Sequence, residues 1–155
     1  MLKKIYILAA SLALSLWVAK ADDLAIVVAK SSALDNLTSA DLTKIFRAEK
    51  AKAPDGTKFV LALPAAGSPE HAAMLEGIYG MDEAAFGKYF LQATFTGLVT
   101  AAPKQISGGA ALCAFAAGTP GGITCVKAGD AGDSVKIVKV DGHAPGDPDY
   151  KLKIK

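Results

Sequence analysis

The sequence has little of what a catalytic or metal site usually needs. Its 155 residues include two histidines, His71 and His143, and no His-x-x-x-His or Cys/His pair with the spacing of a zinc site. It also lacks a Gly-x-Ser-x-Gly nucleophile elbow and a phosphate-binding P-loop. Asp130 and Asp133 share a loop without the EF-hand spacing. We therefore expect no catalytic residues, no metal, no cofactor and no enzymatic activity.

Long hydrophobic runs are absent except at the start of the chain. There, Lys3 and Lys4 precede an apolar stretch from Ile5 to Val18, and Ala19-Lys20-Ala21 has the small-x-small pattern of a cleavage site. The apolar run is shorter than the ~20 residues that a membrane-spanning helix needs, which disfavours an anchor. The pattern predicts a signal peptide over residues 1–21, a single domain over 22–155 with no membrane span after cleavage, and a periplasmic or secreted location.

Residues 22–155, which follow the predicted signal peptide, have no excess of basic residues. All 15 acidic residues lie after residue 21, whereas three of the 17 basic ones lie before it, which leaves 14 and a net charge of −1. No basic cluster with interleaved aromatic residues is present, so nucleic acid is not an expected partner.

Cysteine is scarce, with one residue in a predicted helix, Cys113, and one in the following predicted strand, Cys125. An exported protein can form a disulfide, and a helix that turns back into a strand can bring two such residues together. Spacing alone does not establish the geometry of a bridge. A Cys113–Cys125 disulfide and two buried free thiols both remain open at this point.

What is present is an alternation of short apolar runs with amphipathic stretches. Strands are predicted at residues 24–29, 59–63, 123–126 and 135–140, and a final half-buried strand at 150–154. Helices are predicted after Thr38, Ser68, Asp82 and Ser107, each of which is a good N-cap residue. The order predicts an α/β fold with a small mixed β-sheet flanked by about four helices.

The junction at Gly67-Ser68-Pro69-Glu70 has two interpretations. Ser68 can simply cap the helix that follows, with Pro69 at its first position. The free N–H groups of the first turn can instead bind an anion at the positive end of the helix dipole. Glu70 places a carboxylate in that first turn, which favours the simple cap.

Five segments in one order carry a resemblance to a known family. They are "NLTSADLTKIFRAEKAKAPDGTKFVLAL", "GSPEHAAMLEGIYGM", "KYFLQATFTGLVTAAP", "TPGGITCV" and "VDGHAPGDPDYKL". Together they resemble the phosphate-type periplasmic solute-binding proteins of ABC importers, and more closely the short stand-alone members, over nearly all of residues 24–152. The resemblance implies a fold like one lobe of a type II periplasmic binding protein, because two-lobed members need a chain roughly twice as long.

The resemblance also implies a ligand and its site. It places the family's oxyanion-binding serine and the preceding glycine at Ser68 and Gly67, and the loops at Ser31, Ser32 and Thr96 are further ligand candidates. The family's arginine and threonine are not matched, since residues 63–66 are Leu-Pro-Ala-Ala and Glu70 stands at the threonine position.

Two functions follow from this comparison. The first is capture of phosphate or a similar small oxyanion for an ABC permease, with a second lobe or a homodimer completing the cleft. The second is a degenerate lobe that acts in protein interaction at the envelope without tight ligand binding.

Overall fold

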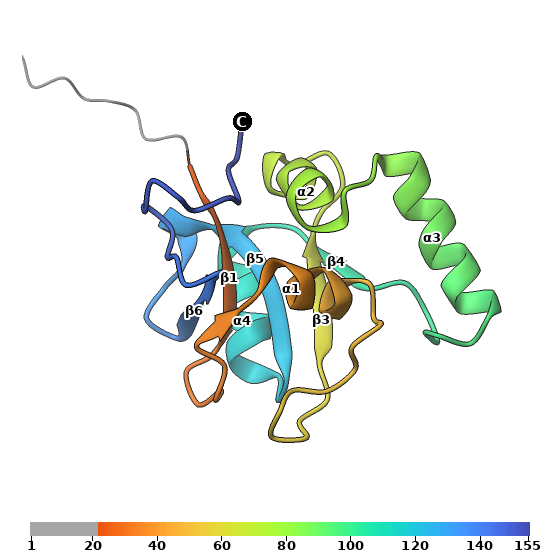
Figure 1. Cartoon of the computed structure of the whole chain (residues 1–155), viewed down its shortest axis with the longest axis horizontal. Coiled ribbons are helices and arrows are strands. Elements are labelled where there is room, and N and C mark those ends of the chain that lie inside the picture. Colours follow the sequence, from red (N-terminus) through yellow and green to blue (C-terminus); the bar gives the residue numbers. More distant parts are fainter. Residues whose placement is uncertain (1–21) are drawn as a thin grey trace, which may run out of the picture.

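The computed structural model describes residues 22–155, and the predicted signal peptide lies outside the described residues. The strands are β1 (Leu24–Ala29), β2 (Asn36–Leu37), β3 (Val60–Pro64), β4 (Lys104–Ile106), β5 (Gly122–Lys127) and β6 (Val135–Val140). The helices are α1 (Ser39–Phe46), α2 (Pro69–Met74), which continues into the π-helical turn η1 (Leu75–Tyr79), α3 (Glu83–Phe95) and α4 (Gly109–Gly118), with a short 3₁₀ turn, η2 (Ala128–Asp130). Figure 1 shows the arrangement.

The six strands form one mixed sheet in the order β2-β6-β1-β5-β3-β4. β3 runs parallel to β4 and β5, and β2 runs parallel to β6. β1 is antiparallel to both of its neighbours, β5 and β6. The carboxyl end of β1 therefore lies at the opposite edge of the sheet from the carboxyl ends of β3, β4 and β5, and this decides where each loop can contribute to a site.

Helices cover both faces of the sheet, so its central strands are buried on both sides. Leu24, Ile26 and Val28 of β1 belong to the core beneath α1, α2 and η1. Ala25 and Val27 face the second core, beneath α4. A continuous apolar run is what a strand covered on both faces requires. The α/β class, the mixed sheet and the four flanking helices predicted from the sequence are confirmed.

Polar contacts join α1, η1 and α3 above the first face. The Tyr79 hydroxyl donates to the carbonyl of Phe46 over 2.7 Å, and the Arg47 guanidinium donates to the carbonyl of Tyr79 over 2.7 Å. The Tyr89 hydroxyl donates to the carbonyl of Arg47 over 2.7 Å. These contacts satisfy carbonyl groups near helix ends that have no partner within their own helix, and they attach α3 to the rest of the domain.

The prediction of a final strand at residues 150–154 is wrong. Tyr150, Leu152 and Ile154 are buried as the alternation requires, but the segment makes only an isolated bridge, Asp23–Lys153, beside the start of β1. The alternation of apolar residues and lysines reflects how this segment packs onto the core. It does not indicate how many hydrogen bonds the segment makes to a neighbouring strand. The short strands β2 and β4 were not predicted, because neither has an apolar run of strand length.

Both cysteines are buried free thiols, and they do not form the Cys113–Cys125 disulfide. Cys125 lies in the core beneath α1 and α2, and Cys113 lies in the core beneath α4. The sheet separates the two side chains. The Cys113 thiol contacts the carbonyl oxygen of Asp130 at 3.4 Å.

Candidate functional site: a hollow between two helix N-termini

The carboxyl ends of β3, β4 and β5 meet at one edge of the sheet. Residues 65–68 lead from β3 into α2, and residues 107–108 lead from β4 into α4. Because these strands are parallel, the N-termini of α2 and α4 are brought to the same edge, which is where ligands bind in open α/β sheets. A hollow of about 170 Å³ lies there. Its polar lining residues are Ser68, Glu70, Ser107, Lys127 and Asp130, together with the backbone of Gly108 and Gly109.

Ser68 caps α2 as the sequence indicates. Its hydroxyl oxygen accepts a hydrogen bond from the N–H of His71 over 3.1 Å and donates to the carbonyl of Ala65 over 2.8 Å. The side chain is thus used within the chain, and a ligand would have to meet backbone amides. Among the described residues, no acceptor is found for the N–H groups of Gly67 and Glu70.

The N-terminus of α4 is more open than that of α2. Ser107 was predicted to cap this helix, and that prediction is wrong: the N-cap is Gly108, at φ 92°, with no side-chain hydrogen bond. In the part of the chain that the structure describes, the N–H groups of Gly109 and Ala110 have no acceptor. Free amides at the positive end of a ten-residue helix favour an anion.

The charges around the hollow oppose one another. Lys127 supplies a cation, although its ammonium nitrogen is 3.6 Å from a carboxylate oxygen of Asp22. Glu70 and Asp130 supply two carboxylates. Asp130 lies against the first turn of α4, since a Cβ added at Gly109 would come within 2.7 Å of its carboxylate oxygen. The amides attract an anion, and the two carboxylates weaken that attraction.

His71 has a structural role beside the hollow. It is buried, and its ring nitrogens lie 2.9 Å from the carbonyl oxygen of Pro64 and 2.8 Å from a carboxylate oxygen of Glu83. It therefore connects the end of β3 to the start of α3 and fixes the first turn of α2 between them. Within residues 22–155 no group of three or more His, Cys, Asp or Glu side chains is arranged to hold a metal ion.

The structure does not bring all of the sequence-predicted ligand residues together. Ser68 lines the hollow, and Gly67 precedes it in the chain without lining the hollow itself. Ser31 and Ser32 follow β1, at the opposite edge of the sheet, and line a different cavity. Thr96 ends α3, and its hydroxyl donates to the carbonyl of Ala93 over 3.3 Å. It lines neither cavity.

Sequence reasoning missed the contributions of Gly108, Gly109, Lys127 and Asp130 to the hollow. The parallel pairing of β3 with both β4 and β5 brings them to the hollow, and this pairing cannot be read from the sequence. The signal that the sequence does offer is Ser-Gly-Gly at residues 107–109, because glycine at a helix start leaves the amides without a side-chain cap.

Comparisons with known proteins support the fold. No protein-family model matches the sequence, and no curated protein matches it. Among solved structures, PstS from Borrelia burgdorferi has a TM-score of 0.66 and 16% identity, over 86% of this chain and 55% of that chain. A Clostridium perfringens protein described as a phosphate ABC transporter substrate-binding protein, with bound phosphate, has a TM-score of 0.64 and 19% identity, over 79% and 46%.

A third neighbour is an ABC-type phosphate transport receptor from Vibrio cholerae, with a TM-score of 0.57 and 16% identity, over 80% of this chain and 48% of that chain. The chain thus spans about half the length of each of these proteins. The resemblance to phosphate-type binding proteins is confirmed for the fold, which corresponds to a single lobe.

Proposed function

We propose that the protein binds a small oxyanion, with phosphate as the first candidate, in the hollow between the N-termini of α2 and α4. The observation that carries the proposal is the convergence of two helix N-termini with free amides on one hollow beside Lys127. The fold likeness to proteins described as phosphate binders supports the same ligand class.

The proposed setting follows from the family that the fold resembles. Residues 1–21 act as a signal peptide, the protein works in the periplasm or outside the cell, and it passes the anion to an ABC permease. A second lobe or a second copy of the chain closes the hollow, because one lobe leaves a bound anion exposed to water and to salt screening. The protein binds its ligand and does not transform it. Within the described residues, no helix is long and apolar enough to span a membrane.

The expected affinity is low for a binding protein. Helix-end effects on exposed charges contribute about 0.3–1 kcal/mol each, whereas micromolar capture needs about 8 kcal/mol in total. Among the described residues no arginine lines this hollow, so no bidentate arginine pair is available to an anion there. Glu70 and Asp130 favour the second candidate, a lobe that serves protein interaction without tight ligand binding.

Isothermal titration calorimetry with phosphate, sulfate and molybdate tests the proposal. We expect a saturable heat for at least one oxyanion at millimolar concentration. Lys127→Gln should weaken binding, and Lys88→Gln, an exposed position on α3, serves as the matched control. If no oxyanion binds at millimolar concentration, the capture function is excluded and the interaction lobe takes its place.

A further inference from the structure

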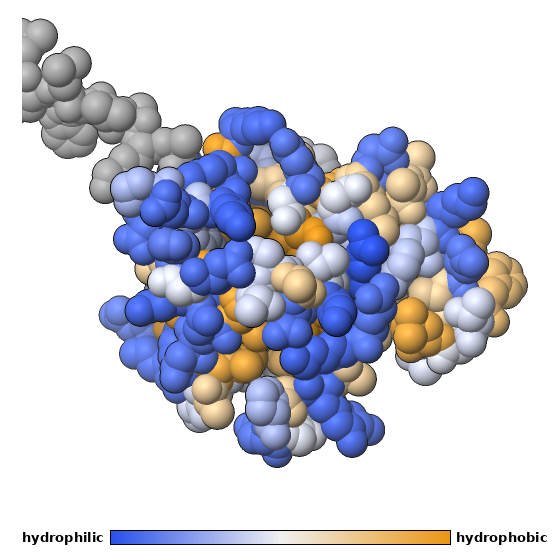
Figure 2. Space-filling view, viewed as in Figure 1, coloured by the Kyte–Doolittle hydropathy of each residue, from blue (hydrophilic) through white to orange (hydrophobic). Residues whose placement is uncertain are grey.

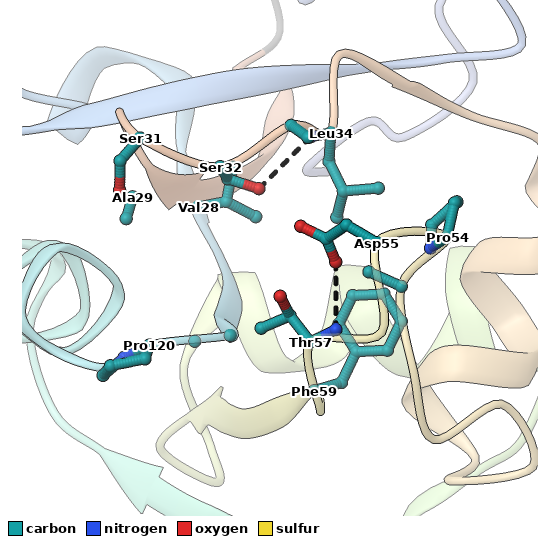
Figure 3. Close-up of a pocket in the computed structure, with 14 residues that line it drawn as sticks. Val28, Ala29, Ser31, Ser32, Leu34, Pro54, Asp55, Thr57, Phe59 and Pro120 are labelled. Carbon is teal, nitrogen blue, oxygen red and sulfur yellow. Dashed lines mark hydrogen bonds between the residues drawn. The ribbon is translucent and has the colours of Figure 1, made fainter.

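A second cavity, of about 510 Å³, lies at the opposite edge of the sheet from the α2/α4 hollow. It is found where β1 ends and where β3 and β5 begin. Three segments form its walls: residues 28–34, 53–59 and 120–122 (Figure 3). Its size is within the range of small-molecule sites.

The walls of this cavity are held by contacts within the chain. Val60 donates its N–H to the carbonyl of Gly121 over 2.9 Å, and the two segments are so close that a Cβ added at Gly121 would lie 1.9 Å from the carbonyl oxygen of Lys58. On the other side, the Ser32 hydroxyl accepts the N–H of Leu34 over 3.2 Å. The cavity is therefore preformed and needs no rearrangement to admit a ligand.

The lining is mostly apolar, and its polar side chains offer only oxygen. Val28, Leu34 and Phe59 belong to the core or pack against it, so they form the floor. The polar side chains of the lining are Ser31, Ser32, Asp55 and Thr57. No lining side chain carries a nitrogen donor, so nothing in the lining would neutralise an anion.

Asp55 provides an ionised carboxylate at this cavity. One carboxylate oxygen accepts the N–H of Thr57 over 2.9 Å, and this bond holds the pKa of Asp55 below its usual value. The Thr57 hydroxyl lowers this pKa as well, and no cation is paired with the other carboxylate oxygen among the described residues. In Figure 3 it faces the open space of the cavity, as does the Thr57 hydroxyl. Lys136, the cation beside Ser32, is already paired with Asp35 at 2.8 Å.

We propose that this cavity binds a small organic cation, with an apolar body on Val28, Leu34 and Phe59 and a primary ammonium group on Asp55 and Thr57. Charge complementarity decides the ligand class, because a carboxylate without a cationic partner, beside hydroxyl oxygens, accepts N–H donors and repels oxyanions. The site is separate from the α2/α4 hollow and does not depend on the function proposed for it.

Three probes of similar shape and different charge test this proposal: 2-phenylethylammonium, 2-phenylethanol and phenylacetate. Binding is followed by the ¹⁵N chemical shifts of the amides at residues 31–34, 55–57 and 121–122. We expect the ammonium probe to bind about three- to fivefold more tightly than the alcohol, as for a partly exposed ion pair, and phenylacetate to bind most weakly. Asp55→Asn should remove the preference for the ammonium probe while the alcohol binds as before.

Asparagine can still accept the N–H of Thr57, so the turn is retained in that variant. Asp133→Asn, in an exposed loop, is the matched control and should change nothing. Ala33 lines the cavity, and Ala33→Phe should weaken the binding of the ammonium probe and of the alcohol equally, because the larger side chain fills the entrance. The proposal would be overturned if the three probes bound equally or if phenylacetate bound most tightly. It would also be overturned if the shifts were confined to other residues or if Asp55→Asn kept the preference for the ammonium probe.

Discussion

At the scale of single residues, two carboxylates, Glu70 and Asp130, oppose the proposed binding of an anion at the α2/α4 hollow. Each lies in the lining where an anion would bind, and each interacts favourably with the positive end of a helix. They therefore occupy, within the chain, the electrostatic position that a bound anion would take. Removing either charge should favour the external ligand.

We predict that Glu70→Thr and Asp130→Asn each tighten phosphate binding by about two- to fivefold, the range of a partly exposed charge interaction. Calorimetric titration measures the change. Asp133→Asn, three residues from Asp130 and outside the hollow, should leave the affinity unchanged. An unchanged affinity in both test variants would mean that the anion binds elsewhere.

The cysteines give a second prediction at this scale. The sheet separates Cys113 from Cys125, and burial raises the pKa of the Cys125 thiol. In denaturant without reductant, a thiol reagent should therefore count two free thiols per chain. In the folded protein Cys125 should react far more slowly than an exposed cysteine, because the thiolate is the reactive form. A count of zero in denaturant would contradict the separation of the two side chains.

At the scale of the element, α3 has two different faces. Phe86, Phe90 and Ala93 are buried, and the rings of Phe86 and Phe90 lie edge-on to Tyr79 of η1. On its other side Leu91 is 61% exposed and Phe95 is 83% exposed. Figure 2 shows apolar surface gathered at the end of this helix. The two phenylalanines allow a direct comparison of one residue type in two environments.

We predict that Phe90→Ala costs about 3–5 kcal/mol of unfolding free energy, since Phe90 is 2% exposed and lies edge-on to the rings of Tyr79, Phe86 and Tyr89. Phe95→Ala should change the free energy by no more than about 0.5 kcal/mol. Urea unfolding of both variants provides the measurement. Similar losses in the two variants would contradict the burial of one face only.

Elements marked by local chemistry could be predicted from the sequence. The caps at Thr38, Ser68 and Asp82 are confirmed, because each depends on a hydrogen bond to an amide three residues away. The short strand β4 was not predicted, since only its pairing with β3 defines it. Ser107 was the expected cap of α4 because serine is a good N-cap residue, but Gly108 takes that position.

At the scale of the whole molecule, strand direction explains why the predicted ligand residues do not form one site. The sequence predicts that Ser31, Ser32 and Ser68 follow strands, and the structure confirms this for each. The sequence, however, contains no signal that β1 is antiparallel to β5. Pairing direction is decided by contacts between residues far apart in the chain. Ser31 and Ser32 therefore lie at a second cavity, on the edge opposite to Ser68.

The domain should lose stability in alkali. Burial raises the pKa of Tyr79, Tyr150 and Cys125 in the folded state above their unfolded values, which are about 10 for tyrosine and 8.5 for cysteine. Above these values the unfolded chain binds fewer protons than the folded one. The contribution of each group is complete below its unfolded pKa and falls by about 1.4 kcal/mol per pH unit above it.

Urea unfolding at pH of about 8 and about 10.5 tests this, and the free energy should be lower at the higher pH. Tyr150→Phe should reduce the pH dependence because one titrating group is removed. A free energy that stays constant across this range would mean that the three groups ionise as readily in the folded state.

The proposed anion site consists of free amides at two helix N-termini. An NMR titration of the ¹⁵N-labelled protein with phosphate tests it most directly. We expect saturable shifts of the Gly67, Glu70, Gly109 and Ala110 amides, while the amides around Asp55 stay unchanged. The proposed site would be contradicted if phosphate shifted other amides and not these four, or if no amide shifted at millimolar phosphate.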